Sequence, residues 1–164
     1  TIWGIGCDAT NKDAVSRIIQ LKGREEDKSL IILLDSENRL ESYVSEVPEI
    51  AYELIEYAEH PLTIVFSGAK NLAENVIHSD KSVGIRIVKH PFCQQLIQRF
   101  RKPVVSTSAN LSGQKAPQNF SEISDEIVNG VDYVVNFEKD DLSEKRPSTI
   151  MKLEADGRFS FIRR

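Results

Sequence analysis

Four short apolar runs, separated by longer amphipathic segments, constrain the fold of this chain more than any other feature. Each run has the length of a β-strand and carries few polar side chains: residues 29–34 (SLIILL), 62–66 (LTIVF), 84–88 (GIRIV) and 103–106 (PVVS). Continuous apolar runs of this length are typical of strands that are buried on both faces of a sheet. The longest of them is far too short to cross a bilayer, so no membrane association is expected.

Helical periodicity fills most of the segments between these runs. Apolar residues recur at helical spacing in 12–24, after a candidate N-cap at Thr10 or Asn11. Prolines suited to a first turn mark the starts of two more helices, at 47–60 and 91–100. Further along, the pattern predicts a helix at 121–128, a strand at 132–137, and a hairpin at 148–164 that turns at Asp156-Gly157.

This alternation predicts a single α/β domain over residues 1–164, a length that suits one domain with a real core. The last strands form a hairpin, so we expect a twisted sheet with parallel and antiparallel pairs, flanked by helices. Ligands of such sheets bind beyond the strand ends, which predicts a pocket at the loop mouths. The chain starts abruptly in a strand-and-turn pattern, TIWGIG, and we expect a first strand and helix to be missing.

The composition limits which nucleic-acid, disulfide and metal interactions are expected. The net charge of -4 argues against a non-specific nucleic-acid coat, although it leaves room for a local basic pocket. The two cysteines form no C-x-x-C pair, and reduced thiols in the cytoplasm are the expected state. The three histidines share no metal-ligand spacing, so no metal site is predicted.

A cluster of cations follows the first predicted helix, in the stretch KGREEDKS. Lys22, Arg24 and Lys28 lie within seven residues. One interpretation is a solvated helix end, because cations near a helix C-terminus complement the helix dipole. The other is a clamp for a triphosphate, because arginine offers a planar fork for phosphate oxygens and lysine a mobile point charge.

Small polar side chains crowd the end of the run at 103–106, in the stretch VVSTSANLSG. Ser106, Ser108 and Asn110 belong to this polar run, which Gly113 closes. Hydroxyls and backbone N–H groups after a strand can cradle phosphate or carboxylate oxygens. Capping and turn chemistry uses the same residue types, so both interpretations stay open from this pattern alone.

Arg86 is a charge inside an apolar run, and its neighbours Ile85 and Ile87 point to the opposite face of the strand. Such a charge either reaches solvent on an edge strand or is buried with a partner, for which a substrate carboxylate is well suited. No Ser-His-Asp set, Walker A loop or GxGxxG motif occurs in the sequence. We therefore expect chemistry by positioning and charge stabilisation rather than by a covalent intermediate.

The order of these motifs resembles the YrdC family. TIWGIGCDA, KGR, GIRIVKHP, SANLSG and PSTI match five family blocks in the family's order, and the similarity covers essentially the whole chain. Five ordered blocks are far more specific than any one of them. The family's first block usually follows P-T-[DE], so Thr1 matches the last residue of that motif. The chain resembles the family's short, single-domain form.

The resemblance implies an enzyme, a threonylcarbamoyl-AMP synthase of the nucleotidyltransferase class. L-threonine and bicarbonate or CO2 would give a carboxylated amine that attacks the α-phosphate of ATP and releases pyrophosphate, with Mg2+ accompanying the nucleotide. Partner proteins would transfer the threonylcarbamoyl group to adenosine 37 of tRNA. The resemblance also implies a cytoplasmic protein, with weak binding of tRNA or double-stranded RNA as a further expectation.

The family's functional positions carry over to this sequence in three groups. The catalytic group, which would hold the phosphate chain and the adenylate, is Lys22, Arg24, Ser108 and Asn110. The ATP-binding group is Arg24, Lys28, Ser82, Ser108, Ala116 and Arg163. The threonine-binding group is Thr1, Arg86, Ser106 and Ser148.

Three positions depart from the family pattern. Leu33 stands at a site that is often polar in the family, and Ala116 where some members have serine. Arg163 matches the nucleotide-binding arginine only if the final hairpin is one residue longer, and Arg164 is nearly as suitable.

Two other functions compete with the enzyme. One is a double-stranded RNA or tRNA-binding module, against which the acidic balance and the lack of interleaved aromatic and basic residues argue. The other is a translation-related or maturation factor that keeps the fold without catalytic activity.

Overall fold

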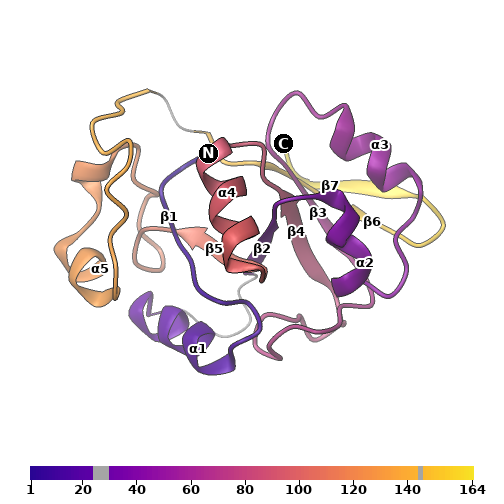
Figure 1. The fold of residues 1–164 in the computed structure, drawn as a ribbon, viewed down its shortest axis with the longest axis horizontal. Helices are drawn as coiled ribbons and strands as arrows, with labels where there is room; N and C mark the ends of the chain where they lie inside the picture. The colour runs from indigo at the N-terminus through magenta and orange to yellow at the C-terminus, as the bar shows by residue number, and fades with distance from the viewer. Residues whose placement is uncertain (24–29, 144–145) are drawn as a thin grey trace.

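The sheet at the centre of the molecule is mixed, as the sequence predicted. A computed structural model describes residues 1–23, 30–143 and 146–164. Within these ranges, seven strands follow the order β1-β5-β2-β4-β3-β6-β7 across the sheet (Figure 1). β2 pairs with β4, and β3 with β6, in parallel, whereas the other neighbours are antiparallel. The strands are β1 (Gly4–Ile5), β2 (Ile31–Leu34), β3 (Leu62–Phe66), β4 (Val83–Ile87), β5 (Val104–Ser108), β6 (Thr149–Leu153) and β7 (Phe159–Arg163).

Four helices among the described residues overlap the predicted segments, and a fifth, at Leu40–Tyr43, was not predicted. They are α1 (Lys12–Leu21), α2 (Leu40–Tyr43), α3 (Ile50–Glu56), α4 (Pro91–Phe100) and α5 (Asp125–Gly130), with single 3-10 turns η1 (Glu37–Arg39) and η2 (Phe120–Glu122). α1 begins after Asn11, whose side chain accepts a hydrogen bond from the Ala14 backbone N–H at 3.1 Å. α4 begins with proline in its first turn, where a missing N–H costs nothing.

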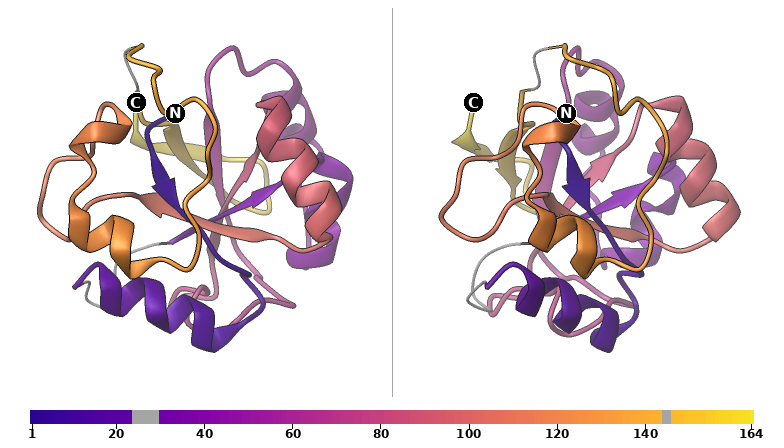
Figure 2. Two further views of the ribbon diagram at one scale, coloured as in Figure 1. Left: turned by 60° about the vertical axis from the view of Figure 1, so that its left-hand side comes forward. Right: turned by 90° about the vertical axis from the view of Figure 1, so that its left-hand side faces the viewer.

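The helices divide between the two ends of the sheet. α1 and α5 lie side by side at the β1 end, as both views in Figure 2 show. An ion pair joins α1 to the chain after α5, between Arg17 and Asp132 at 2.9 Å. α2 and α3 lie toward the β3 and β6 end (Figure 1). No helix among the described residues is both long and apolar enough to span a bilayer.

One face of the sheet carries the main apolar core. Neighbouring strands place their side chains in one row across this face, and each is at most 2% exposed: Val105, Ile32, Ile85, Ile64 and Met151. The next residue along most of these strands points to the other face, where the functional side chains gather. At the far edge, Gly157 has φ +84° in the turn between β6 and β7, as the Asp-Gly pattern predicted.

The predicted strand at 132–137 is wrong. Residues 131–137 belong to no sheet within the described chain, although they run on from α5 into a non-helical segment. Their apolar side chains line a cavity beside α4, and their backbone joins no strand ladder within the described chain. The physical reason is that this apolar stretch packs on a helix instead: the Phe137 ring stacks on Phe92 of α4, with ring centres 4.8 Å apart.

Candidate functional site

Arg86 lies in the middle of the sheet, because β4 is paired on both sides. Its guanidinium donates to Thr63 Oγ1 at 3.1 Å, to Ser148 Oγ at 2.8 Å and to Thr1 Oγ1 at 3.4 Å. These acceptors are neutral hydroxyls, and none of the ion pairs seen among the described residues includes Arg86. Arg86 therefore does not reach solvent from an edge strand. Its positive charge has no anionic partner among the described residues, so a bound anion would stabilise it.

Arg163, near the end of β7, approaches the same serine from the other side. Its Nε and one terminal nitrogen donate to the Ser148 carbonyl oxygen at 3.1 and 2.9 Å. Burial, and then the nearby charge of Arg163, lower the pKa of Arg86 to about 10. Two guanidiniums that share one serine, with no acid from the described residues between them, make a site for an anion such as a carboxylate or phosphate.

Lys22 and the turn after β5 form a second cluster. The Lys22 side chain is 3% exposed, and its Nζ donates to the carbonyl oxygens of Ser108 and Asn110, each at 2.5 Å. The Lys22 carbonyl accepts in turn from the Ser112 N–H at 2.8 Å. The structure places Lys22 directly beneath the turn, where the ammonium fixes the backbone and adds positive charge to it.

Asn110 stabilises that turn from within. Its Nδ2 donates to the Leu111 carbonyl at 2.9 Å and to the Gln114 carbonyl at 2.8 Å. Its Oδ1 is buried and has no hydrogen-bond partner in the described structure. The Asn110 side chain therefore shapes the loop, and its Oδ1 can still accept a hydrogen bond from a ligand.

The first strand connects the two clusters. Gly4 pairs with Ser108, and the Ala109 N–H donates to the Trp3 carbonyl at 2.9 Å. Thr1, three residues before Gly4, contacts Arg86. The chain from Thr1 to Gly4 therefore runs from the Arg86 cluster to the Ser108 turn.

A cavity of about 1210 Å³ opens beside these clusters. Thr1, Arg86 and Ser106 line it from the sheet side together with Leu33, whose neighbour in the ladder is Arg86. Apolar side chains of α1, α4, α5 and residues 131–137 line much of the rest, and charged side chains such as Arg17, Glu59 and Lys89 also border it. Both free cysteines also line it, and burial raises the pKa of Cys7 to about 12. The cavity is thus a largely apolar chamber with a few directed polar groups, which is the usual form of a small-molecule site.

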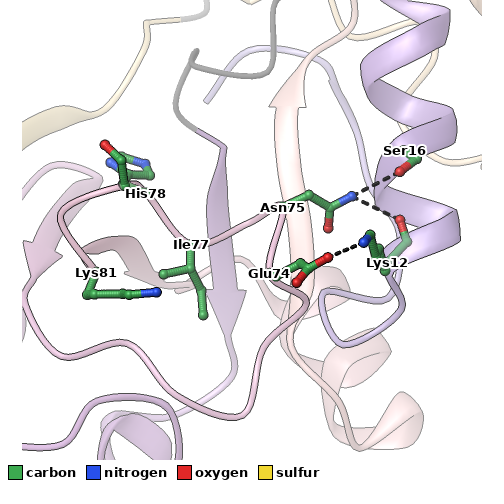
Figure 3. Close-up of a pocket in the computed structure, with 8 residues that line it drawn as sticks. Lys12, Ser16, Glu74, Asn75, Ile77, His78 and Lys81 are labelled. Carbon is green, nitrogen blue, oxygen red and sulfur yellow. Dashed lines mark hydrogen bonds and ion pairs between the residues drawn. The ribbon is translucent and has the colours of Figure 1, made fainter.

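Ser82 lies apart from the Arg86 cluster, beside a second cavity. Its hydroxyl contacts Asp80 Oδ1 at 2.6 Å and His78 Nδ1 at 3.3 Å, and Ser82 is 2% exposed. His78 lines a cavity of about 440 Å³ between α1 and the loop before β4 (Figure 3). In this arrangement the Ser82 hydroxyl is held by its own loop.

The remaining predicted residues divide into three cases. Arg24 and Lys28 lie outside the described residues. Ala116 lies half-buried in the loop after the Ser108 turn. Of the two C-terminal arginines, Arg163 joins the anion site, whereas the Arg164 guanidinium lies 4.4 Å from the Phe161 ring centre.

Thr63 is the one member of the Arg86 cluster that the sequence analysis missed. It is fully buried, and its hydroxyl contacts both Arg86 and Ser148. The available signal was a polar side chain inside the apolar run LTIVF, the same feature that singled out Arg86.

Comparison with known proteins identifies the family of this chain. A family model for the Sua5/YciO/YrdC domain, described as "Telomere recombination", matches residues 1–164. A putative threonylcarbamoyl-AMP synthase of Methanocaldococcus jannaschii is 34% identical over 157 residues, which are 95% of this chain and 72% of that protein. A threonylcarbamoyl-AMP synthase of Pseudoalteromonas translucida is 32% identical over 138 residues, 82% of this chain and 74% of that protein.

A solved structure shares the fold. The crystal structure of P. abyssi Sua5 complexed with L-threonine superposes with a TM-score of 0.81 at 27% identity. The match covers 93% of this chain but only 45% of that chain, so the protein described here spans less than half of Sua5. With the family model matching from the first residue to the last, this chain belongs to the Sua5/YciO/YrdC family.

Proposed function

We propose that the protein is a threonylcarbamoyl-AMP synthase, a nucleotidyltransferase that uses L-threonine, bicarbonate or CO2, and ATP. The observation that carries this proposal is the pair of guanidiniums on Ser148, which has no acid partner among the described residues and is connected by β1 to the Ser108 turn. Family membership and the names of the relatives supply the reaction.

The L-threonine carboxylate would bind at Arg86. Arg86 donates to the hydroxyls of Thr1 and Ser148, so the guanidinium and two hydroxyls lie together. Ser106 lines the same cavity and has no side-chain hydrogen bond among the described residues, so its hydroxyl is available to the amino acid. A charge-assisted, two-pronged bond from arginine is the usual way to hold a carboxylate in a desolvated site.

The nucleotide would bind toward the Ser108 turn. Lys22 beneath the turn and Arg24 beyond it would supply positive charge, while Ser108 and Asn110 shape the loop. Lys28, Ser82, Ala116 and Arg163 complete the proposed ATP contacts. In the reaction, a carboxylate oxygen of the carboxylated threonine amine attacks the α-phosphorus, the bond to the β-phosphate oxygen breaks, and pyrophosphate leaves. Positioning and charge neutralisation are sufficient for such chemistry.

Mg2+ would enter with the nucleotide rather than through a cage of protein ligands. The described residues hold no group of three or more histidine, cysteine, aspartate or glutamate side chains placed to share an ion. Mg2+ at nucleotide sites is carried largely by phosphate oxygens and water, and it neutralises phosphate charge there.

This function is favoured over an RNA-binding module without catalysis, because the conspicuous site is a confined two-arginine pocket and not an extended basic surface. Downstream proteins would then transfer the threonylcarbamoyl group to tRNA.

The direct test is pyrophosphate release with ATP and Mg2+, in which L-threonine or bicarbonate is omitted in turn. We expect release only with both substrates present. Release that continues without either of them would reject the proposal, and so would tight, salt-sensitive RNA binding in a protein that turns over no ATP.

A further inference from the structure

Thr63 is a buried hydroxyl between the two side chains that would hold the amino acid. It is 0% exposed and lies on β3, which is paired with β4 on one side and with β6 on the other. Its Oγ1 accepts from Arg86 Nε at 3.1 Å and lies 2.9 Å from Ser148 Oγ. A single hydroxyl therefore touches both members of the proposed carboxylate site without facing the cavity itself.

The hydrogen-bond inventory assigns a direction to the Thr63–Ser148 contact. Each hydroxyl has one hydrogen to donate and two lone pairs, and each already accepts from Arg86; Arg163 lies 3.5 Å from Ser148 Oγ, too far to fill the second lone pair of that oxygen. If Ser148 donated to Thr63, the Thr63 hydrogen would be left inside the sheet with no acceptor among the described residues, where no ligand can reach it. If Thr63 donates to Ser148, the spare hydrogen belongs to Ser148, which is 2% exposed but lies against Arg86, a residue that lines the cavity. The second arrangement avoids the cost of a permanently unsatisfied buried donor.

The backbone of β4 fixes the rotamer of Thr63. The Thr63 methyl lies over Gly84, 3.5 Å from the position that a Cβ on that residue would occupy, which is ordinary van der Waals distance. Threonine is stiff about χ1, and a methyl held over Gly84 directs the hydroxyl toward Arg86 and Ser148.

We propose that Thr63 is a positioning residue for substrate: it orients the Arg86 guanidinium and donates to Ser148, so that the Ser148 hydrogen points at the substrate carboxylate. This inference rests on the proposed function for the identity of the carboxylate, L-threonine. Thr63 itself touches no reactant.

The matched variants are Thr63→Val and Thr63→Ser, measured by calorimetric titration with L-threonine and, separately, with ATP. Valine keeps the shape but removes the acceptor and the donor, so the Kd for L-threonine should rise by about tenfold or more. The Kd for ATP should change by less than about threefold. Thr63→Ser keeps the hydroxyl and loses one methyl, and it should return to within about threefold of the wild-type value.

Two further variants separate positioning from simple destabilisation. Val65→Ala, at the next same-face position on β3, should lower the melting temperature while leaving the Kd for L-threonine unchanged. Adding Thr63→Val to Ser148→Ala should weaken L-threonine binding less than Thr63→Val weakens it in the wild-type protein, because the directed Ser148 donor is already gone and only the orientation of Arg86 is left to lose. If Thr63→Val does not fold, Thr63→Ala serves in the same comparisons.

Equal weakening of L-threonine and ATP binding, failure of Thr63→Ser to restore binding, or full additivity with Ser148→Ala would overturn the role of Thr63, as would wild-type protein that binds no L-threonine. The proposed function fails separately. Wild-type protein that binds L-threonine but releases no threonine-dependent pyrophosphate would reject the reaction, while the binding comparison would still decide the role of Thr63.

Discussion

The two faces of the central sheet differ in what their side chains do, although the same strands build both. On one face, Ile32, Ile85 and Ile64 form an unbroken row in which each side chain is at most 2% exposed. On the other, the next residue of β4 is Arg86 and the preceding residue of β3 is Thr63, and these two are hydrogen-bonded to each other. One strand can thus serve stability and binding at the same time, because successive side chains point to opposite faces.

Replacing Arg86 by methionine should give the largest difference between an effect on activity and an effect on stability. We expect kcat/KM for L-threonine to fall by about a thousandfold, since a desolvated carboxylate would lose its charged partner. The free energy of unfolding should stay level or rise, because burial disfavours the lone Arg86 charge and methionine fills a similar volume. Pyrophosphate assays and denaturant titrations measure the two quantities. A parallel collapse of both would mean that Arg86 belongs to the core rather than to the site.

Ile32 and Leu33 are adjacent on β2 and point to opposite faces of the sheet, so their variants compare the core face with the cavity face within one strand. Ile32→Ala should lower the free energy of unfolding by about 3 kcal/mol, because it empties a fully buried position. Leu33→Ala, on the half-buried cavity side, should cost about 1 kcal/mol. Only Leu33→Ala should change the KM for L-threonine, since Leu33 lies beside Arg86 and lines the cavity. Similar losses of stability in both variants would contradict the difference between the faces.

Lys22→Met should weaken the nucleotide side of the site. The change removes the donor to the Ser108 and Asn110 carbonyls while keeping a long apolar stem. We expect kcat to fall by about a hundredfold, the scale of losing a preorganised charged group. Lys12→Met is the control on the same helix, because Lys12 lies on the exposed surface beside Glu74. Unchanged turnover in Lys22→Met would remove Lys22 from the proposed machinery.

The smallest expected effect is a pH dependence that arises from Arg86. Burial, and then the charge of Arg163, lower its folded-state pKa to about 10, below the ordinary value for arginine. Well below pH 10 the group is charged in both states, and the penalty for burying its charge is fully present. As pH rises through and above about 10, the unfolded state binds more protons than the folded state, so this residue's contribution to stability increases with pH. The melting temperatures of wild-type protein and Arg86→Met should therefore differ by a constant amount well below pH 10 and converge as the pH rises above it, and a gap that widens instead would contradict the assignment.

Local patterns predicted the elements well where the signal was itself local. α4 begins and ends at the predicted residues, because a first-turn proline and helical spacing are sufficient to define it. The final hairpin turns at Asp156-Gly157, since the positive φ of Gly157 is a property of the turn. The segment at 132–137 was predicted as a strand because an extended apolar stretch looks the same whether it pairs or not. The short helical stretch at 37–43 carried too few apolar repeats to be noticed.

The sequence by itself determined the α/β class, the buried strands and the residue types able to hold an anion, because period and side-chain chemistry are local. Only the tertiary structure decided which of these residues meet. Arg86 and Ser148 are 62 positions apart, and Arg163 approaches Ser148 from another strand. Their meeting depends on β3 pairing with β4 on one side and β6 on the other, and the packing of the whole chain selects such pairings.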